Sequence, residues 1–92
     1  MSILVRFAPP SMTTEQYEAI KQRVTDAFGS FPPDGMEYHV CFGPEGDRRV
    51  SEIWASREQF DAFAEQLLPA IREEGVEPIE PEILEVYNQV RG

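Results

Sequence analysis

The sequence is poor in the residues that mark secreted and membrane proteins. It has 92 residues, a single cysteine, and no apolar run that approaches the length of a membrane span. One cysteine cannot form an internal disulfide, so nothing indicates an oxidising compartment. The N-terminal apolar run is very short, contains Arg6, and lacks the basic start and long apolar centre of a secretory signal. We therefore expect a cytoplasmic protein.

Basic residues are also scarce. Eight Lys and Arg stand against seventeen Asp and Glu, which gives a net charge of -9. Such a chain repels the phosphates of nucleic acids and the anionic surface of a membrane, and no basic stripe offsets this repulsion. We expect neither nucleic acid nor membrane as a partner. Most of the acidity is explained by solubility alone.

What the sequence does contain is a regular succession of strand and helix patterns. Its length suits one domain, residues 1–92. Alternating apolar residues predict four strands, over residues 2–8, 36–42, 49–55 and 82–90. Apolar residues at spacings of three and four predict two helices, which begin at the capping boxes Thr13-x-x-Gln16 and Ser56-x-x-Gln59. Pro69 interrupts the second helical pattern and predicts a kink or a fresh helical start there.

The order β-α-β-β-α-β predicts an α+β fold of the ferredoxin-like type. In this fold a four-stranded antiparallel sheet carries two helices on one face, and right-handed crossovers join them. Four aromatic residues at helical spacing are expected to fill the core between the layers: Tyr17, Phe28, Phe60 and Phe63. The chain supplies no cover for the other face of the sheet, so we expect a homodimer through the sheet faces.

The central hairpin, residues 36–55, holds the only histidine, cysteine and tryptophan. If Phe42 lies opposite Arg49, then His39 faces Glu52 and Glu37 faces Trp54. This register predicts a helix-packed face made of Met36, Tyr38, Val40, Phe42, Ser51, Ile53 and Ala55. It predicts that the other face, a pocket wall or a dimer seam, carries Glu37, His39, Cys41, Val50, Glu52 and Trp54.

Three residues of the hairpin are the functional candidates. His39 beside Glu52 could act as a general base, and Trp54 could stack on an aromatic ligand. Each also has an ordinary structural explanation. His39 could be a strand histidine bonded to Glu52 or water, Trp54 a core residue, and Glu52 a solvated glutamate or a partner of Arg6. Cys41 is expected to be a small buried hydrophobe. One histidine and one cysteine fall short of a metal-ligand set, so no metal site is predicted.

Several stretches resemble the dimeric α+β barrel superfamily, in particular its antibiotic biosynthesis monooxygenase (ABM) domains. They are the strand and capped helix from ILVRF to MTTEQY, the Pro/Asp/Gly turn into MEYHV, and then SEIWASREQFDAF, LLPAIREEG and EVYNQV. Together they cover nearly the whole chain. The most specific part is the junction Glu52-x-Trp54-x-Ser56 with Phe60 and Phe63 following it.

The resemblance implies a dimeric α+β barrel made face to face through the sheets, with a cavity between sheet and helices in each subunit. ABM-type members oxidise phenolic or quinol substrates with O₂ and need no metal or flavin, so it implies no cofactor. For such chemistry the chain offers His39 and Glu52 as catalytic residues, and Trp54, Arg6 and Asn88 as substrate-binding residues. Haem-degrading members use a histidine of the second helix, which this chain lacks, so haem degradation is disfavoured.

Two functions stay open at this point. The first is a cofactor-independent monooxygenase acting on a phenolic or quinone-like small molecule. The alternative is a non-enzymatic dimeric module that binds a small ligand or serves in assembly. Whether the chain is an enzyme at all depends on whether His39 and Trp54 share a closed pocket.

Overall fold

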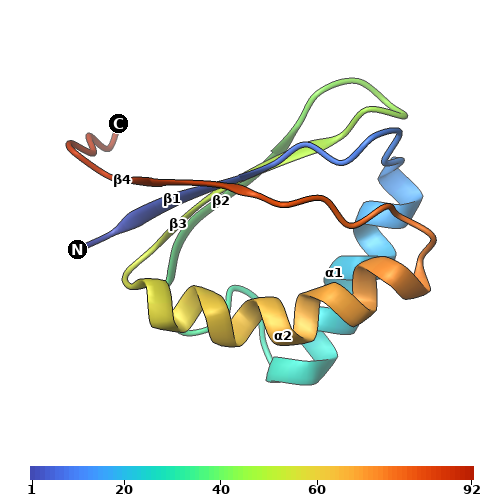
Figure 1. Ribbon diagram of the computed structural model, residues 1–92, viewed down its shortest axis with the longest axis horizontal. Helices are drawn as coiled ribbons and strands as arrows, with labels where there is room; N and C mark the ends of the chain where they lie inside the picture. Colours follow the sequence, from blue (N-terminus) through green and yellow to red (C-terminus); the bar gives the residue numbers. More distant parts are fainter.

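The computed structural model describes residues 1–92 and has the predicted element order. The elements are β1 (Ile3–Phe7), α1 (Thr14–Phe28), β2 (Met36–Phe42), β3 (Arg49–Trp54), α2 (Arg57–Glu73) and β4 (Glu82–Glu85). The four strands form one antiparallel sheet in the order β2-β3-β1-β4. Both helices cover the same face of this sheet (Figure 1). This arrangement confirms the ferredoxin-like α+β fold. Neither helix is long and apolar enough to cross a membrane.

Capping side chains determine where both helices begin. At α1 the Thr13 hydroxyl accepts the Gln16 backbone N–H, and the Gln16 side chain accepts the Thr13 N–H, so the predicted capping box is complete. At α2 the Ser56 hydroxyl accepts the Gln59 N–H. The Gln59 side-chain oxygen accepts from the Ser56 hydroxyl instead of returning to the backbone. The second box is therefore only half formed.

Helix α2 runs past Pro69 to Glu73 without a break, so the predicted fresh start does not occur. Proline removes one N–H and leaves the carbonyl four residues earlier without its helical partner. Pro69 and Glu65 both lie on the exposed side of α2. Water can therefore reach the freed carbonyl, which makes the proline tolerable inside the helix.

The helices cover the opposite face of the hairpin from the one predicted. Val50, Glu52 and Trp54 are buried beneath the helices, whereas Tyr38 is 47% exposed. The neighbouring strand explains the difference. Val5 of β1 pairs with Glu52 and is fully buried, and paired residues share one face of a sheet. Within the hairpin both faces carry apolar residues, so only the contacts outside it decide which face meets the helices.

The hairpin register is as predicted from Phe42 opposite Arg49 to His39 opposite Glu52. It then changes at a β-bulge between Met36 and Tyr38, so Trp54 pairs with Met36 and not with Glu37. The bulge has a clear effect on burial, because Met36 joins the core and Glu37 stays exposed.

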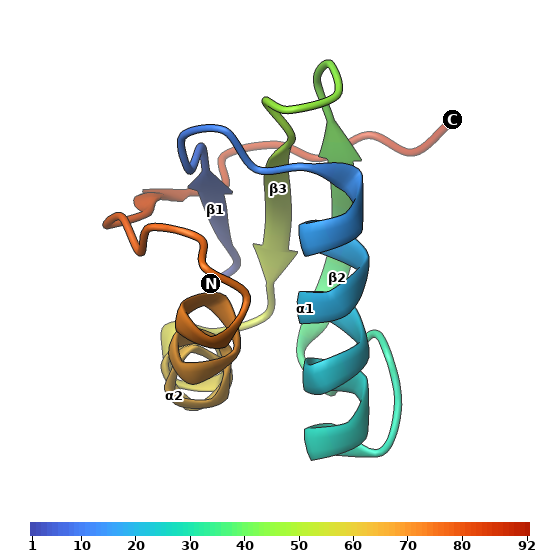
Figure 2. The ribbon, with the colours of Figure 1, turned by 90° about the vertical axis from the view of Figure 1, so that its right-hand side faces the viewer.

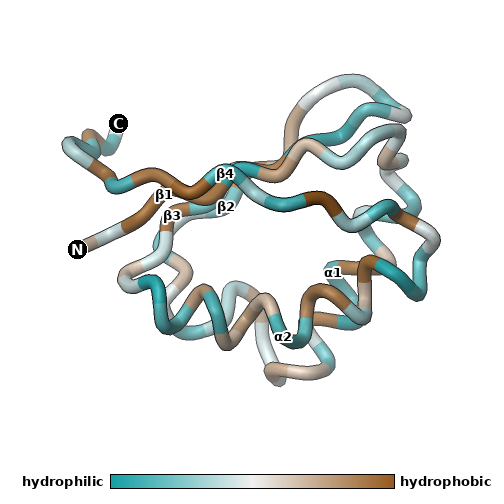
Figure 3. Tube along the Cα trace, in the orientation of Figure 1, coloured by the Kyte–Doolittle hydropathy of each residue, from teal (hydrophilic) through white to brown (hydrophobic).

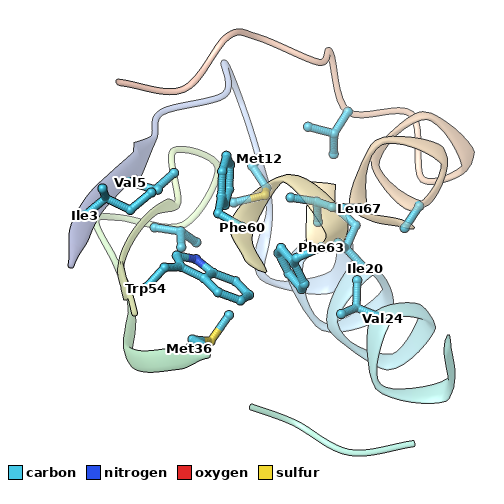
Figure 4. Packing of buried hydrophobic residues seen from close by; sticks show 13 residues of the cluster. Ile3, Val5, Met12, Ile20, Val24, Met36, Trp54, Phe60, Phe63 and Leu67 are labelled. Atoms are coloured by element: carbon cyan, nitrogen blue, oxygen red, sulfur yellow. The ribbon is translucent and has the colours of Figure 1, made fainter. Parts of the chain in front are cut away.

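The core forms around Trp54, whose side chain is fully buried (Figure 4). Its ring centroid lies 4.9 Å from that of Phe63 and 5.9 Å from that of Phe60, both on α2. In Figure 3 helix α2 alternates between hydrophilic and hydrophobic segments along its length, as an amphipathic helix does. Phe28 differs from the expectation, because it is 38% exposed and only stacks on Phe63 at the edge of the core.

Strand β4 ends at Glu85, five residues before the predicted end at Val90. It is an edge strand that pairs only with β1, and its Glu85 already lies opposite Ile3, the first residue of that strand. One more backbone bond, from the Val86 N–H to the Ser2 carbonyl, completes the pairing. The chain beyond it has no partner strand and leaves the sheet (Figure 1), which makes Tyr87 fully exposed.

Replacing Trp54 tests the centre of this core. Trp54→Ala should lower the free energy of unfolding by about 3–5 kcal/mol, because it removes a large buried ring. Urea unfolding followed by circular dichroism measures the change, since the only tryptophan is lost as a fluorophore. Tyr87→Ala is the matched control and should stay within about 0.5 kcal/mol, because that ring packs on nothing. Equal effects of the two variants would contradict this description of the core.

Candidate active site

Four side chains from α1, β2 and β3 form one line of hydrogen bonds beneath the helices. The Tyr17 hydroxyl lies 2.7 Å from His39 Nε2. His39 Nδ1 lies 2.8 Å from Glu52 Oε2. The indole N–H of Trp54 donates to Glu52 Oε1 over 3.0 Å. The hairpin register and the helix-covered face together create this line, because they direct His39, Glu52 and Trp54 toward α1 and α2.

The chemistry of each side chain determines which atom donates in each of these hydrogen bonds. An indole N–H can only donate, so Glu52 Oε1 accepts. With Glu52 as a carboxylate, its other oxygen accepts the Nδ1–H of His39. Nε2 then carries a lone pair, and the Tyr17 hydroxyl donates to it. The carboxylate thus fixes the tautomer and orientation of the imidazole, as an orienting group does for a general base.

These side chains are buried, so the loss of any hydrogen bond in this network would destabilise the fold. The Glu52 side chain is 3% exposed and that of His39 is 16% exposed. A carboxylate out of water is strongly destabilising unless both oxygens have partners, and both have them here. No buried side-chain nitrogen or oxygen in the chain lacks a hydrogen-bond partner.

Tyr17 and Cys41 both have a pKa above the ordinary value. Burial raises the pKa of Tyr17 to about 12, and the negative charges of Cys41, Glu18 and Glu52 add to the effect. Tyr17 is therefore a neutral hydrogen-bonding group at physiological pH. Burial also raises the pKa of the Cys41 thiol, so Cys41 is a poor nucleophile.

This line of hydrogen bonds from Trp54 through Glu52 and His39 to Tyr17, called the polar line below, ends in a pocket between the sheet and both helices. Its cavity volume is about 60 Å³, and eleven of its fifteen lining residues are hydrophobic. Its polar lining residues are Tyr17, Lys21, His39 and Glu52. Figure 2 shows how the two helices flank the strands on this side. A mostly apolar hollow with a few polar groups suits a small aromatic molecule.

Solved structures with the same architecture include a cofactor-independent oxygenase and proteins described as antibiotic biosynthesis monooxygenases. The protein Rv0793 from Mycobacterium tuberculosis is 15% identical with a TM-score of 0.62, over 98% of this chain and 97% of its own. SnoaB, a cofactor-independent oxygenase from Streptomyces nogalater, is 14% identical with a TM-score of 0.61, over 99% and 96%. A proposed antibiotic biosynthesis monooxygenase from Chloroflexus aurantiacus is 16% identical with a TM-score of 0.62, over the full length of both chains. The chain therefore shares the fold of ABM-type solved structures.

The likeness is one of fold, because neither a sequence-family model nor a curated protein matches the chain. At identities of 13–16% the solved structures assign no residue roles here. The roles of individual side chains in this ABM fold therefore depend on their own geometry.

Three of the five residues proposed from the sequence lie at the site of this ABM fold. His39 and Glu52 line the pocket, whereas Trp54 lies behind Glu52 without lining it. His39 and Trp54 therefore do not share the pocket, contrary to the sequence-based expectation for an enzyme. Arg6 is on the uncovered face of the sheet, where its guanidinium lies 3.5 Å from Glu82. Asn88 is exposed beyond the end of β4. Arg6 follows the buried Val5, and adjacent strand residues point to opposite faces, so it cannot reach the pocket.

Sequence reasoning missed Lys21 and Phe31 as pocket residues, and it missed the hydrogen bond that joins the Tyr17 hydroxyl to His39. Tyr17 was assigned to the core because it shares a helical stripe with Ile20 and Val24. Its hydroxyl was the available signal, since a buried tyrosine oxygen needs a polar partner. Phe31 lies in the connector after α1 and meets His39 edge-on, with ring centroids 5.1 Å apart. No group of three or more His, Cys, Asp and Glu side chains in the chain is placed to hold a metal ion.

The high pKa of Tyr17 gives a direct spectroscopic test. The difference in 295 nm absorbance between the parent and Tyr17→Phe should titrate with a midpoint near pH 12, instead of the ordinary value of 10.0. The shift is upward, so its contribution to stability is full below pH 10 and is lost as pH rises through 12. A difference curve centred at the ordinary value, with the fold intact by circular dichroism, would show that Tyr17 is solvated.

Proposed function

We propose that the protein is a cofactor-independent oxygenase acting on a phenolic or quinol-like aromatic molecule. The observation that carries the proposal is the Glu52-oriented His39 at the polar end of an apolar pocket. The fold it shares with SnoaB, a cofactor-independent oxygenase, supports the same reaction class. Fold likeness alone would not carry it, because one fold serves many functions.

The first step is removal of the substrate's hydroxyl proton. The Tyr17 hydroxyl donates to His39 Nε2 and has lone pairs free to accept from a substrate hydroxyl. A proton can move from substrate to Tyr17 while the Tyr17 proton moves to His39. Tyr17 stays neutral throughout, in keeping with its raised pKa. The resulting imidazolium is stabilised by Glu52, which lies 2.8 Å from its other nitrogen.

The second step consumes O₂ without any other reductant. The phenolate transfers an electron to O₂, and the radical pair joins to form a C–O bond and a hydroperoxide. Loss of water from the hydroperoxide leaves a new carbonyl. The overall change for a hydroquinone is QH₂ + O₂ → hydroxyquinone + H₂O, in which the substrate supplies all four electrons. The apolar walls favour this route, because they bind the ring and exclude bulk water from the reactive intermediate.

A non-enzymatic ligand-binding module is the second candidate. One observation favours it, namely that every polar atom of the line already has a protein partner. Such a line could serve to rigidify the core instead of moving protons. The two candidates bind similar molecules and differ only in whether O₂ is consumed.

Oxygen uptake with a panel of hydroquinones distinguishes these functions. The parent should consume O₂ above background, and His39→Gln should lower that rate by about 10²–10⁴-fold, the usual contribution of a general base. Glu82→Gln is the control, because Glu82 is exposed and pairs with Arg6 on the uncovered face. Rates at background for the folded parent on the whole panel would favour the module. Equal rates for the parent and His39→Gln would remove His39 from the mechanism.

We also propose that a second copy of the chain covers the bare face of the sheet. That face exposes 47% of Tyr38 and 48% of Leu84, with Leu4 and Ile53 half-buried between them. The helices lie on the other side, so nothing in the chain shields these side chains (Figure 1). A self-complementary contact about a two-fold axis would bury them.

Sedimentation equilibrium tests the dimer. At micromolar concentration the parent should have about twice the chain mass of 10.5 kDa. Leu84→Glu should shift the population toward monomer, because it places a charge within the proposed interface. Glu58→Gln, on the exposed surface of α2, is the control. A parent that sediments as a monomer at every concentration would contradict the proposal.

A further inference from the structure

Lys21 is the only lysine of the chain and lines the pocket that holds the polar line. It lies on α1 four residues after Tyr17, and residues with this spacing share one side of a helix. The two side chains therefore border the same pocket from neighbouring turns. Lys21 is half-buried, and no carboxylate lies within ion-pair distance of its ammonium group.

This lack of a partner is unusual in so acidic a chain. Five of the other cations form ion pairs with carboxylates: Arg6, Arg23, Arg48, Arg49 and Arg57. Arg72 and Arg91 have no such partner, but both are exposed and neither lines the pocket. Lys21 is thus the single positive charge at the pocket, in a molecule with a net charge of -9.

Phe31 connects Lys21 to the polar line. The Lys21 ammonium lies 5.7 Å from the centre of the Phe31 ring. The same ring meets His39 edge-on, with centroids 5.1 Å apart. An aromatic face in this position holds the cation beside the pocket by a cation–π contact without neutralising it. The ammonium group keeps its capacity to bind an anion.

We infer that the substrate is an aromatic ring with a hydroxyl group at one end and a carboxylate or similar anion at the other. The hydroxyl would meet Tyr17 and His39, and the anion would pair with Lys21. Four residues of helix separate the two backbone positions by about 6 Å, which is comparable with the span of one benzene ring with para substituents. This inference deepens the proposed function and rests on it for the role of His39 and Tyr17.

The buried carboxylate of Glu52 lines the same pocket and is held at its histidine end. Both of its oxygens accept hydrogen bonds, from His39 and Trp54, and its side chain is 3% exposed. It therefore acts on the histidine end of the pocket. Lys21, on the next turn of α1, is the pocket charge that remains free to select a ligand.

Binding of para-hydroxybenzoate and its neutral isostere para-hydroxybenzamide tests the inference. Calorimetry without O₂ measures affinity with no turnover, at neutral pH. The parent should bind the acid about tenfold more tightly than the amide, the effect of one charge-assisted contact near solvent. Lys21→Gln should abolish this preference, and Lys21→Arg should keep most of it. Arg72→Gln is the matched control, since it removes an exposed cation outside the pocket and should leave the preference unchanged.

Three results would overturn the inference. The first is an unchanged preference in folded Lys21→Gln, which would mean that Lys21 only covers Phe31. The second is equal loss of preference in Arg72→Gln, which would indicate a general charge effect. The third is the absence of binding by either probe. These outcomes are separate from failure of the oxygenase, because calorimetry without O₂ measures binding alone and requires no turnover.

Discussion

The structure depends on one buried carboxylate. Glu52 lies on a central strand, almost out of water, where an unpartnered negative charge would cost several kcal/mol. Its two oxygens are satisfied by His39 from the neighbouring strand and by Trp54 from its own. Trp54 in turn packs on α2, and His39 reaches Tyr17 on α1. One charge therefore couples the hairpin to both helices, and a shift of either strand would leave it unpaired.

The need to give Glu52 hydrogen-bond partners also positions the polar groups of the pocket. Satisfying Glu52 orients His39, and the free side of that imidazole faces Tyr17 at the wall of an apolar hollow. Polar groups therefore gather at one end of the hollow, and the unpaired Lys21 is the exception on the next turn of α1. In the proposed reaction, such a site would combine proton movement with selection of a ring and its charged substituent. The fold is shared with solved structures that include the cofactor-independent oxygenase SnoaB.

Much of the backbone could be predicted from local signals. Thr13 and Gln16 mark the start of α1 because they satisfy each other's N–H groups, and His39 faces Glu52 because turn length sets the hairpin register. The face of the hairpin could not be predicted this way. Val50, Glu52 and Trp54 look like a mixed surface in isolation, and they become core only because β1 places Val5 beside them. The family resemblance placed Arg6 at the site, but its strand directs Arg6 to the other face of the sheet.

The sequence by itself determined the element order, the helix starts and most of the hairpin register, since each depends on residues close together along the chain. Tertiary structure alone decided that β4 ends at Glu85, because the length of β1 limits the pairing. It also decided that Tyr17, His39 and Glu52 form one line and that Lys21 borders the same pocket. These residues come from three separate elements, which the packing of the helices on the sheet brings together. That packing is stable because the buried carboxylate of Glu52 has a hydrogen-bond partner at each oxygen.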